Sequence, residues 1–135
     1  MALSDPKKWL FEPKTWRVLT GIYVLIITFA SLNPWFRPRS ENNFWSPDKW
    51  LHFAAYLGLS ILLGLSSART KKNDWLAIMA IAGTLGFGLE LVQGIALPFR
   101  TFSWHDAASN LAGAALGAIL IKIIIRPAGS SIIMK

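Results

Sequence analysis

The chain contains no cysteine and few acidic residues. The missing cysteine excludes disulfide bonds, thiolate metal sites and cysteine nucleophiles. Only seven of the 135 residues are Asp or Glu, two are His, and charged residues make up 16% of the chain. A nucleophile elbow, a phosphate-binding P-loop and a dinucleotide-binding glycine pattern are also absent. Any chemistry must therefore rest on a small number of ionisable side chains.

Long apolar runs dominate the rest of the sequence. Hydrophobic residues make up 53% of a chain whose length suits one domain, and a soluble domain of this size cannot bury so much apolar surface. Each run is near the length that crosses a bilayer as a helix. We therefore predict an all-α, polytopic integral membrane protein with one transmembrane domain over residues 1–135. Its four expected helices are about 16–32, 50–68, 75–97 and 106–125.

The segments outside these runs are short. Residues 1–15 alternate lysines with aromatic residues and predict an interfacial lead-in, and residues 127–135 form a short tail. A basic segment before an apolar run is also typical of a cleaved signal peptide. No A-x-A-like site follows the first run, so we expect a retained span. Before the second run, Ser46-Pro47-Asp48 is typical of a helix start, with Ser46 as N-cap.

The net charge of +7 is distributed between the apolar runs, which is how topology signals are arranged. We therefore do not expect nucleic-acid binding. If the four runs span a membrane, ten basic residues fall on the side of both termini and four on the other. The positive-inside rule then places both termini in the cytoplasm.

This orientation brings a set of polar residues to the non-cytoplasmic side. They come from the start of the second run, the end of the third and the start of the fourth. Ionisable groups at membrane depth are energetically costly, and they suggest function. The set is Asp48, His52, Glu90, Gln93, Arg100, His105, Asp106 and Asn110.

On the second helix, Asp48, His52 and Tyr56 follow one another at intervals of four and share one face. Asp48 is placed to hold the imidazole of His52 and to raise its basicity. The simpler interpretation is that Asp48 only caps the helix. A histidine one turn inside a span, however, needs a partner or water.

On the third helix, Glu90 and Gln93 share a face. Glu90 lies roughly 10 Å below the expected helix end, at 1.5 Å per residue. A lone ionised carboxylate at that depth is costly, so we expect Glu90 to be neutral, paired or next to water. Arg100 and His52 are the expected partners. The alternative is a structural ion pair that only holds helices together.

The fourth helix carries a stripe of Asp106, Asn110, Gly113 and Gly117. The two glycines form a GxxxG pair, which lets another helix approach closely. The pair is weak evidence for dimerisation and better evidence for tight packing within this chain.

Three kinds of chemistry fit the polar set. His52 with Glu90 and Asp106 could bind a divalent metal, although no H-x-x-E or HExxH spacing supports this. The same residues could act in general acid/base catalysis, with a carboxylate orienting His52. Arg100 could hold a phosphate or carboxylate through its planar guanidinium. An outward-facing site of this kind suits a lipid-linked phosphate or another envelope molecule.

At these residues the sequence resembles the VanZ-like family of small bacterial membrane proteins. The matching pieces are DKWLHFAAY (48–56), ELVQ (90–93), RTFSWHD (100–106) and NLAGAALG (110–117). Each piece alone is weak, but together they occur in order over residues 48–117. The first span and the tail carry none of them, and His105 is not part of the pattern.

The resemblance implies a protein of the bacterial cytoplasmic membrane with about four spans. The family takes its name from a member associated with resistance to teicoplanin, but many relatives occur outside resistance clusters. The family's polar residues, carried over by position, are Asp48, Lys49, His52, Tyr56, Glu90, Gln93, Arg100, Asp106 and Asn110.

We therefore expect an outward-facing polar site that binds an amphiphilic or lipid-linked envelope molecule and acts on it if the site is catalytic. His52, Glu90 and Asp106 are the candidate catalytic residues. The rival hypothesis is a small transporter or assembly factor with a proton relay or packing network. Ligand identity, cofactors, metal and oligomeric state stay open at this point. The candidate ligand-binding residues are Asp48, Lys49, Tyr56, Gln93, Arg100 and Asn110.

Overall fold

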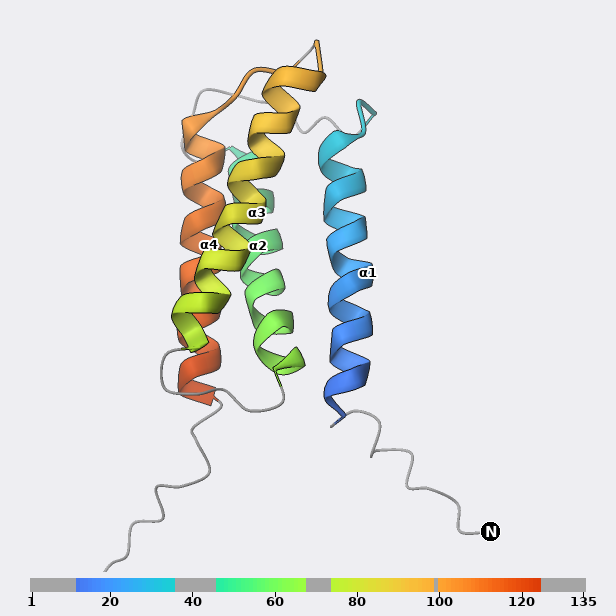
Figure 1. Ribbon diagram of the computed structural model, residues 1–135. Coiled ribbons are helices and arrows are strands. Elements are labelled where there is room, and N and C mark those ends of the chain that lie inside the picture. Colours follow the sequence, from blue (N-terminus) through green and yellow to red (C-terminus); the bar gives the residue numbers. More distant parts are fainter. Residues whose placement is uncertain (1–11, 36–45, 68–73, 99, 125–135) are drawn as a thin grey trace, which may run out of the picture.

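The protein, seen here as a computed structural model, is described over residues 12–35, 46–67, 74–98 and 100–124. All regular structure in these residues is helical (Figure 1). The four helices have 20 to 23 residues and are apolar enough to cross a membrane. The predicted all-α fold class is confirmed. The helices are α1 (Pro13–Leu32), α2 (Pro47–Ser66), α3 (Asp74–Ala96) and α4 (Trp104–Ile124).

α1 and α2 begin three residues before their apolar runs because proline sets their first turn, and the Ser46-Pro47-Asp48 pattern predicted this start for α2. α1 starts at Pro13 rather than Trp16, and α2 starts at Pro47 rather than Trp50. Proline is favoured at the first helical position, since its fixed φ suits the helix and its missing N–H is not needed there. An apolar run therefore underestimates the length of a helix that starts with a polar turn. Residues 47–49 consequently belong to α2 and not to the preceding loop.

The end of α1 at Leu32 agrees with the prediction, and the other boundaries differ by one or two residues. α4 starts at Trp104, because the Ser103 hydroxyl accepts a hydrogen bond from the Asp106 backbone N–H at 3.3 Å and so caps the helix. α3 ends at Ala96, before Pro98. Of the predicted lead-in, residues 13–15 are helical. Residues 1–11 and the predicted tail lie outside the described part of the chain.

Among the described helices, α2 and α4 make the most extensive contact. A Cβ atom added to Gly113 would overlap the carbonyl oxygen of Phe53, and one added to Gly117 would overlap that of Leu57. The two backbones therefore touch, and only glycine allows this. The prediction that the GxxxG pair serves packing within the chain is confirmed.

α1 stands beside the other three helices and contacts mainly α2 (Figure 1). Its outer face is apolar and exposed, as expected for contact with lipid. Three polar contacts attach it along its length: Arg17 Nε donates to the Ser66 carbonyl at 3.3 Å, the Tyr23 hydroxyl to the Ala55 carbonyl at 3.0 Å, and Gln93 Nε2 to the Ser31 carbonyl at 2.5 Å.

The two ends of the bundle differ. The start of α1 and the end of α4 lie at one end, at the bottom of Figure 1. The opposite end gathers the end of α1, the start of α2, the end of α3 and the start of α4. This second end, called the polar end below, holds the residues that the sequence singled out.

Candidate functional site

Three helices bury polar side chains at the polar end. Each of these side chains is 9% exposed or less, which is unusual for ionisable groups in an apolar bundle. The helices thus form a polar layer inside a chain that is otherwise apolar. The members are Asp48 and Lys49 on α2, Glu90 and Gln93 on α3, and Asp106 and Asn110 on α4.

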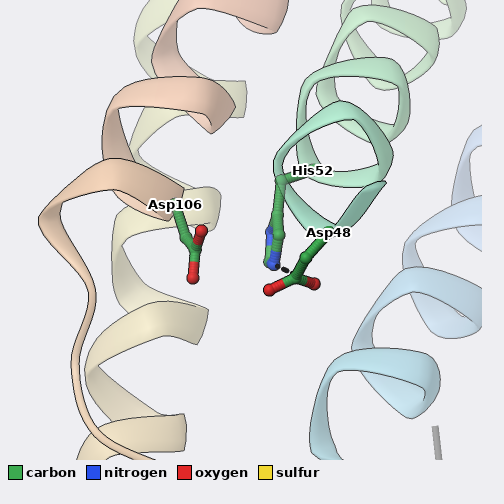
Figure 2. Close-up of side chains that lie close together, drawn as sticks. All are labelled: Asp48, His52 and Asp106. Carbon is green, nitrogen blue, oxygen red and sulfur yellow. Dashed lines mark ion pairs between the residues drawn. The ribbon is translucent and has the colours of Figure 1, made fainter. Parts of the chain in front are cut away.

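Asp48, His52 and Asp106 converge at the centre of this layer. Figure 2 shows the imidazole of His52 between the two carboxylates, with Asp48 and His52 on α2 and Asp106 on α4. His52 Nε2 lies 3.6 Å from Asp48 Oδ1, as the spacing of four residues predicted. One ligand atom from each residue lies within 4.8 Å of the others. We call these three residues the carboxylate–histidine cluster.

Asn110 sets the orientation of the imidazole. Its Nδ2 donates to the Gly86 carbonyl at 3.4 Å, so its Oδ1 faces His52 Nδ1 at 3.0 Å. An amide oxygen only accepts hydrogen bonds, so Nδ1 carries a proton and donates it. The second ring nitrogen, Nε2, is therefore the atom that faces the carboxylates.

Glu90 has a backbone partner that the sequence did not predict. Its Oε1 accepts a hydrogen bond from the Ser103 backbone N–H at 2.9 Å, and the residue is 3% exposed. Glu90 therefore ties the end of α3 to the turn that starts α4. The sequence grouped it with His52 and Asp106, but in the structure Asp48 takes that place in the cluster.

Lys49 and Ser46 form a contact at the start of α2. Lys49 Nζ donates to the Ser46 hydroxyl at 3.0 Å, and both residues are buried. Ser46 occupies the predicted N-cap position, yet its hydroxyl makes no capping bond to the helix backbone. The prediction of Ser46 as the N-cap residue is confirmed, although its hydroxyl accepts from Lys49 and not from the helix backbone.

A cavity of about 360 Å³ lies between α1 and α2, next to the cluster. One part of its wall is apolar and the other carries polar groups, including two members of the cluster. The apolar residues are Ile26, Ile27, Ala30, Leu51, Ala54 and Ala55, and the polar ones are Tyr23, Ser31, Asp48, His52, Tyr56, Gln93 and Arg100.

The predicted site residues therefore separate into two groups. Asp48, His52, Tyr56, Gln93 and Arg100 line the cavity. The others are not part of this wall: Glu90 and Asn110 contact backbone groups, Asp106 is a member of the cluster, and Lys49 contacts the Ser46 hydroxyl. His105 is exposed on α4, away from both.

Sequence reasoning missed the contribution of α1. Tyr23, Ala30 and Ser31 line the cavity, although the first span carries no motif. A signal was present, because Tyr23 and Ser31 are polar residues eight positions apart in an apolar run. That spacing puts both on one helix face.

Taken together, these features define a multi-pass helical membrane protein with a buried carboxylate–histidine cluster beside an amphipathic cavity. No protein-family model, no curated protein and no solved structure matches the chain.

Proposed function

We propose that the protein is a VanZ-like protein of the bacterial cytoplasmic membrane that binds an amphiphilic, anionic envelope molecule at the outer leaflet. The observation that carries this proposal is the cavity, which joins an apolar wall to a polar one. Its volume of about 360 Å³ falls in the usual range for small-molecule sites, about 300–1,000 Å³.

The cavity wall suits a ligand with an apolar chain and a charged head. Ile26, Ala30 and Ala54 offer a surface for the chain, and burying it there removes apolar area from contact with water or headgroups. At the polar wall, the guanidinium of Arg100 matches a phosphate or carboxylate, and Gln93 and His52 add hydrogen-bonding groups. A lipid-linked phosphate has both parts.

Two further arguments support the outer location and the family. The basic residues are concentrated on the side of both termini, so the polar end faces outward. The residues of the VanZ-like resemblance are also the ones that gather at the polar end. In this proposal the ligand is an envelope lipid or precursor, and a link to teicoplanin resistance would act through that ligand.

A transporter or assembly factor is the less favoured function. A carrier needs polar groups along a path to the other side of the membrane. In the described residues, the buried charged groups all lie at the polar end. The lower half of the bundle is filled by residues such as Ile78, Ala118 and Ile121.

The apolar half of the proposal is tested by filling the cavity. Ala30→Phe places a ring in the cavity, whereas Ala80→Phe adds the same ring on an exposed position of α3. The probe is a polyprenyl monophosphate added to the purified protein in nanodiscs, with binding measured by native mass spectrometry. We expect Ala30→Phe to weaken binding by about tenfold or more, which corresponds to about 1.4 kcal/mol, and Ala80→Phe to leave it unchanged. Equal binding by both variants would contradict the cavity as the site.

The polar half is tested by comparing the monophosphate with the uncharged polyprenol. We expect the protein to prefer the phosphate and Arg100→Gln to remove that preference, because the charge-assisted contact is lost. Lys14→Gln is the control, since Lys14 is exposed at the start of α1, near the other end of the bundle. Should Arg100→Gln keep the full preference for phosphate, the assigned role of Arg100 is wrong.

A further inference from the structure

We propose that Asp48, His52 and Asp106 form a divalent-cation site for a transition metal ion of the Zn²⁺ type. Imidazole and carboxylates are ordinary ligands for such ions. The set differs from the one that sequence spacing suggested, because Asp48 replaces Glu90. The inference goes beyond the proposed function and does not depend on it.

The first argument is that buried carboxylate oxygens in the cluster lack partners. Among the described residues, Asp48 Oδ1 and Asp106 Oδ1 are buried atoms with no hydrogen-bond partner. The two residues are only 5% and 9% exposed. A buried polar atom without a partner is costly, and more so when it is charged. A cation between the carboxylates removes this cost at both atoms.

The second argument comes from the proton on His52. Because Nδ1 donates to Asn110, a neutral imidazole presents the lone pair of Nε2 to the carboxylates. A lone pair facing acceptor oxygens is repulsive unless a cation lies between them. Metal-binding histidines are usually held in this way, with the other ring N–H donated to an oxygen.

The distances between the ligand atoms of the cluster also fit a bound metal ion. The distance of 3.6 Å between His52 Nε2 and Asp48 Oδ1 is too long for a hydrogen bond. Two ligands on one tetrahedral Zn²⁺ ion, with bonds of about 2.1 Å, lie about 3.4 Å apart. All three ligand atoms fall within 4.8 Å, so small side-chain rotations complete the geometry. Figure 2 shows that the side chains already point to a common space.

The competing explanation is a proton on Nε2, which would make His52 an imidazolium between two carboxylates. Other charges also surround the cluster: Glu90, Arg100 and Lys49 all lie close enough to act on Asp48, or on its neighbours, through space. The metal site and the protonated trio differ in one measurable property, which is the binding of a metal ion.

A three-residue site also leaves a coordination position open. Asp48 and His52 are in the cavity wall, so the open position lies toward the cavity. Zinc sites with three protein ligands keep the fourth position for water or a substrate group. An anionic head in the cavity would then meet the ion as well as Arg100.

The test is Zn²⁺ binding by the full chain in nanodiscs after EDTA treatment, measured by isothermal titration calorimetry. We expect one ion per chain. His52→Ala and Asp106→Asn should weaken binding by about 100-fold or more, since loss of an outer partner alone changes metal affinity by about 10–100-fold. His105→Ala is the matched control, because His105 is the other histidine of the chain and is exposed. Its affinity should match that of the unmodified protein.

A stability measurement, one further variant and a second metal ion complete the test. Thermal unfolding in EDTA reports whether the isosteric Asp106→Asn variant is folded. Asn110→Ala should weaken Zn²⁺ binding by about 10–100-fold without abolishing it, because it removes only the orienting contact. Cobalt(II) should give the visible absorption of a bound ion, and His52→Ala should remove that absorption.

The proposal is overturned if the protein binds Zn²⁺ no tighter than about 1 mM, or if His52→Ala binds it as well as the unmodified chain. It is also overturned if His105→Ala abolishes binding. Ala30→Phe should keep its Zn²⁺ affinity. Loss of polyprenyl phosphate binding with Zn²⁺ binding intact therefore removes the proposed function alone, and the reverse result removes only the metal site.

Discussion

At the scale of single residues, the polar end is organised around the side chain of Asn110. Its amide reaches from α4 to the Gly86 carbonyl on α3 and to His52 on α2. The residue is 1% exposed, so water does not replace either contact. Three helices are therefore held in register by one amide group.

The first prediction follows from this contact. Asn110→Ala leaves the Gly86 carbonyl and His52 Nδ1 without their partner, and we expect a loss of about 1–3 kcal/mol in the free energy of unfolding. Ser109→Ala is the control, because the Ser109 hydroxyl contacts only its own helix in an exposed position. Thermal unfolding in detergent compares the two variants. Equal stability would show that the hydrogen bonds of Asn110 do not contribute to the free energy of unfolding.

Contacts between side chains at helical spacing could be predicted from the sequence, and contacts to backbone could not. The Asp48–His52 pair follows from an interval of four residues. The partner of Glu90 is a backbone N–H in the turn before α4, and every residue except proline carries that group. No residue type at Ser103 indicates which carboxylate its N–H will meet.

At the scale of helices, the α2–α4 interface determines where the cluster forms. Gly113 and Gly117 bring the backbones together, and Asp106 lies on the same helix one to two turns before Asn110 and Gly113. The distance between Asp106 and the residues of α2 is thus set by backbone contact. Long flexible side chains play little part in it.

The second prediction concerns this interface. Gly113→Ala introduces a Cβ that overlaps the Phe53 carbonyl, so the helices must separate, and we expect a loss of about 1–3 kcal/mol. In Gly88→Ala the new Cβ on α3 meets nothing within 4 Å. That control should be neutral or gain up to about 1 kcal/mol from better helix propensity. If Gly113→Ala leaves the free energy of unfolding unchanged, the close approach of the α2 and α4 backbones is contradicted.

Helix existence was predictable at this scale because apolar runs of about 20 residues leave few alternatives. The first residues of the helices were less predictable. Hydropathy changes at Trp16 and Trp50, but Pro13 and Pro47 already begin the helices. For α2 the Ser46-Pro47-Asp48 pattern supplied the start that hydropathy missed, and this first turn contains Asp48 of the site.

At the scale of the whole molecule, the buried charged residues of the described chain lie at the polar end, and the positive-inside rule predicts that this end faces the cell exterior. Thr101 is exposed at the polar end, and Glu12 is exposed at the other. Because the chain has no cysteine, a single introduced thiol has no background in labelling experiments.

The third prediction uses these positions. In intact bacterial cells, a membrane-impermeant maleimide should label Thr101→Cys and should label Glu12→Cys only after permeabilisation. The unmodified chain is the control and should take up no label. Labelling of both variants from one side, or in the reverse pattern, would refute the outward-facing site.

The sequence predicted a polar pocket, but it did not predict a cavity with α1 as one of its walls. Its existence depends on how far α1 stands from α2, and that depends on the Tyr23, Arg17 and Gln93 contacts, which join residues distant in sequence. The motif-bearing part of the chain, residues 48–117, supplies only part of the wall. The remainder comes from α1, which hydropathy identifies only as a membrane span.

The attachment of α1 has a consequence for selectivity. The polar wall draws most on α2, which supplies Asp48, His52 and Tyr56. The α2–α4 backbones touch beside it, so the head of a ligand would meet a preorganised surface. The apolar wall includes residues of α1, which contacts α2 less extensively than α4 does. Under the proposed function, we expect such a site to discriminate more strictly between headgroups than between acyl or prenyl chains of different length. A set of ligands sharing one head and differing in chain should therefore bind with nearly equal affinity.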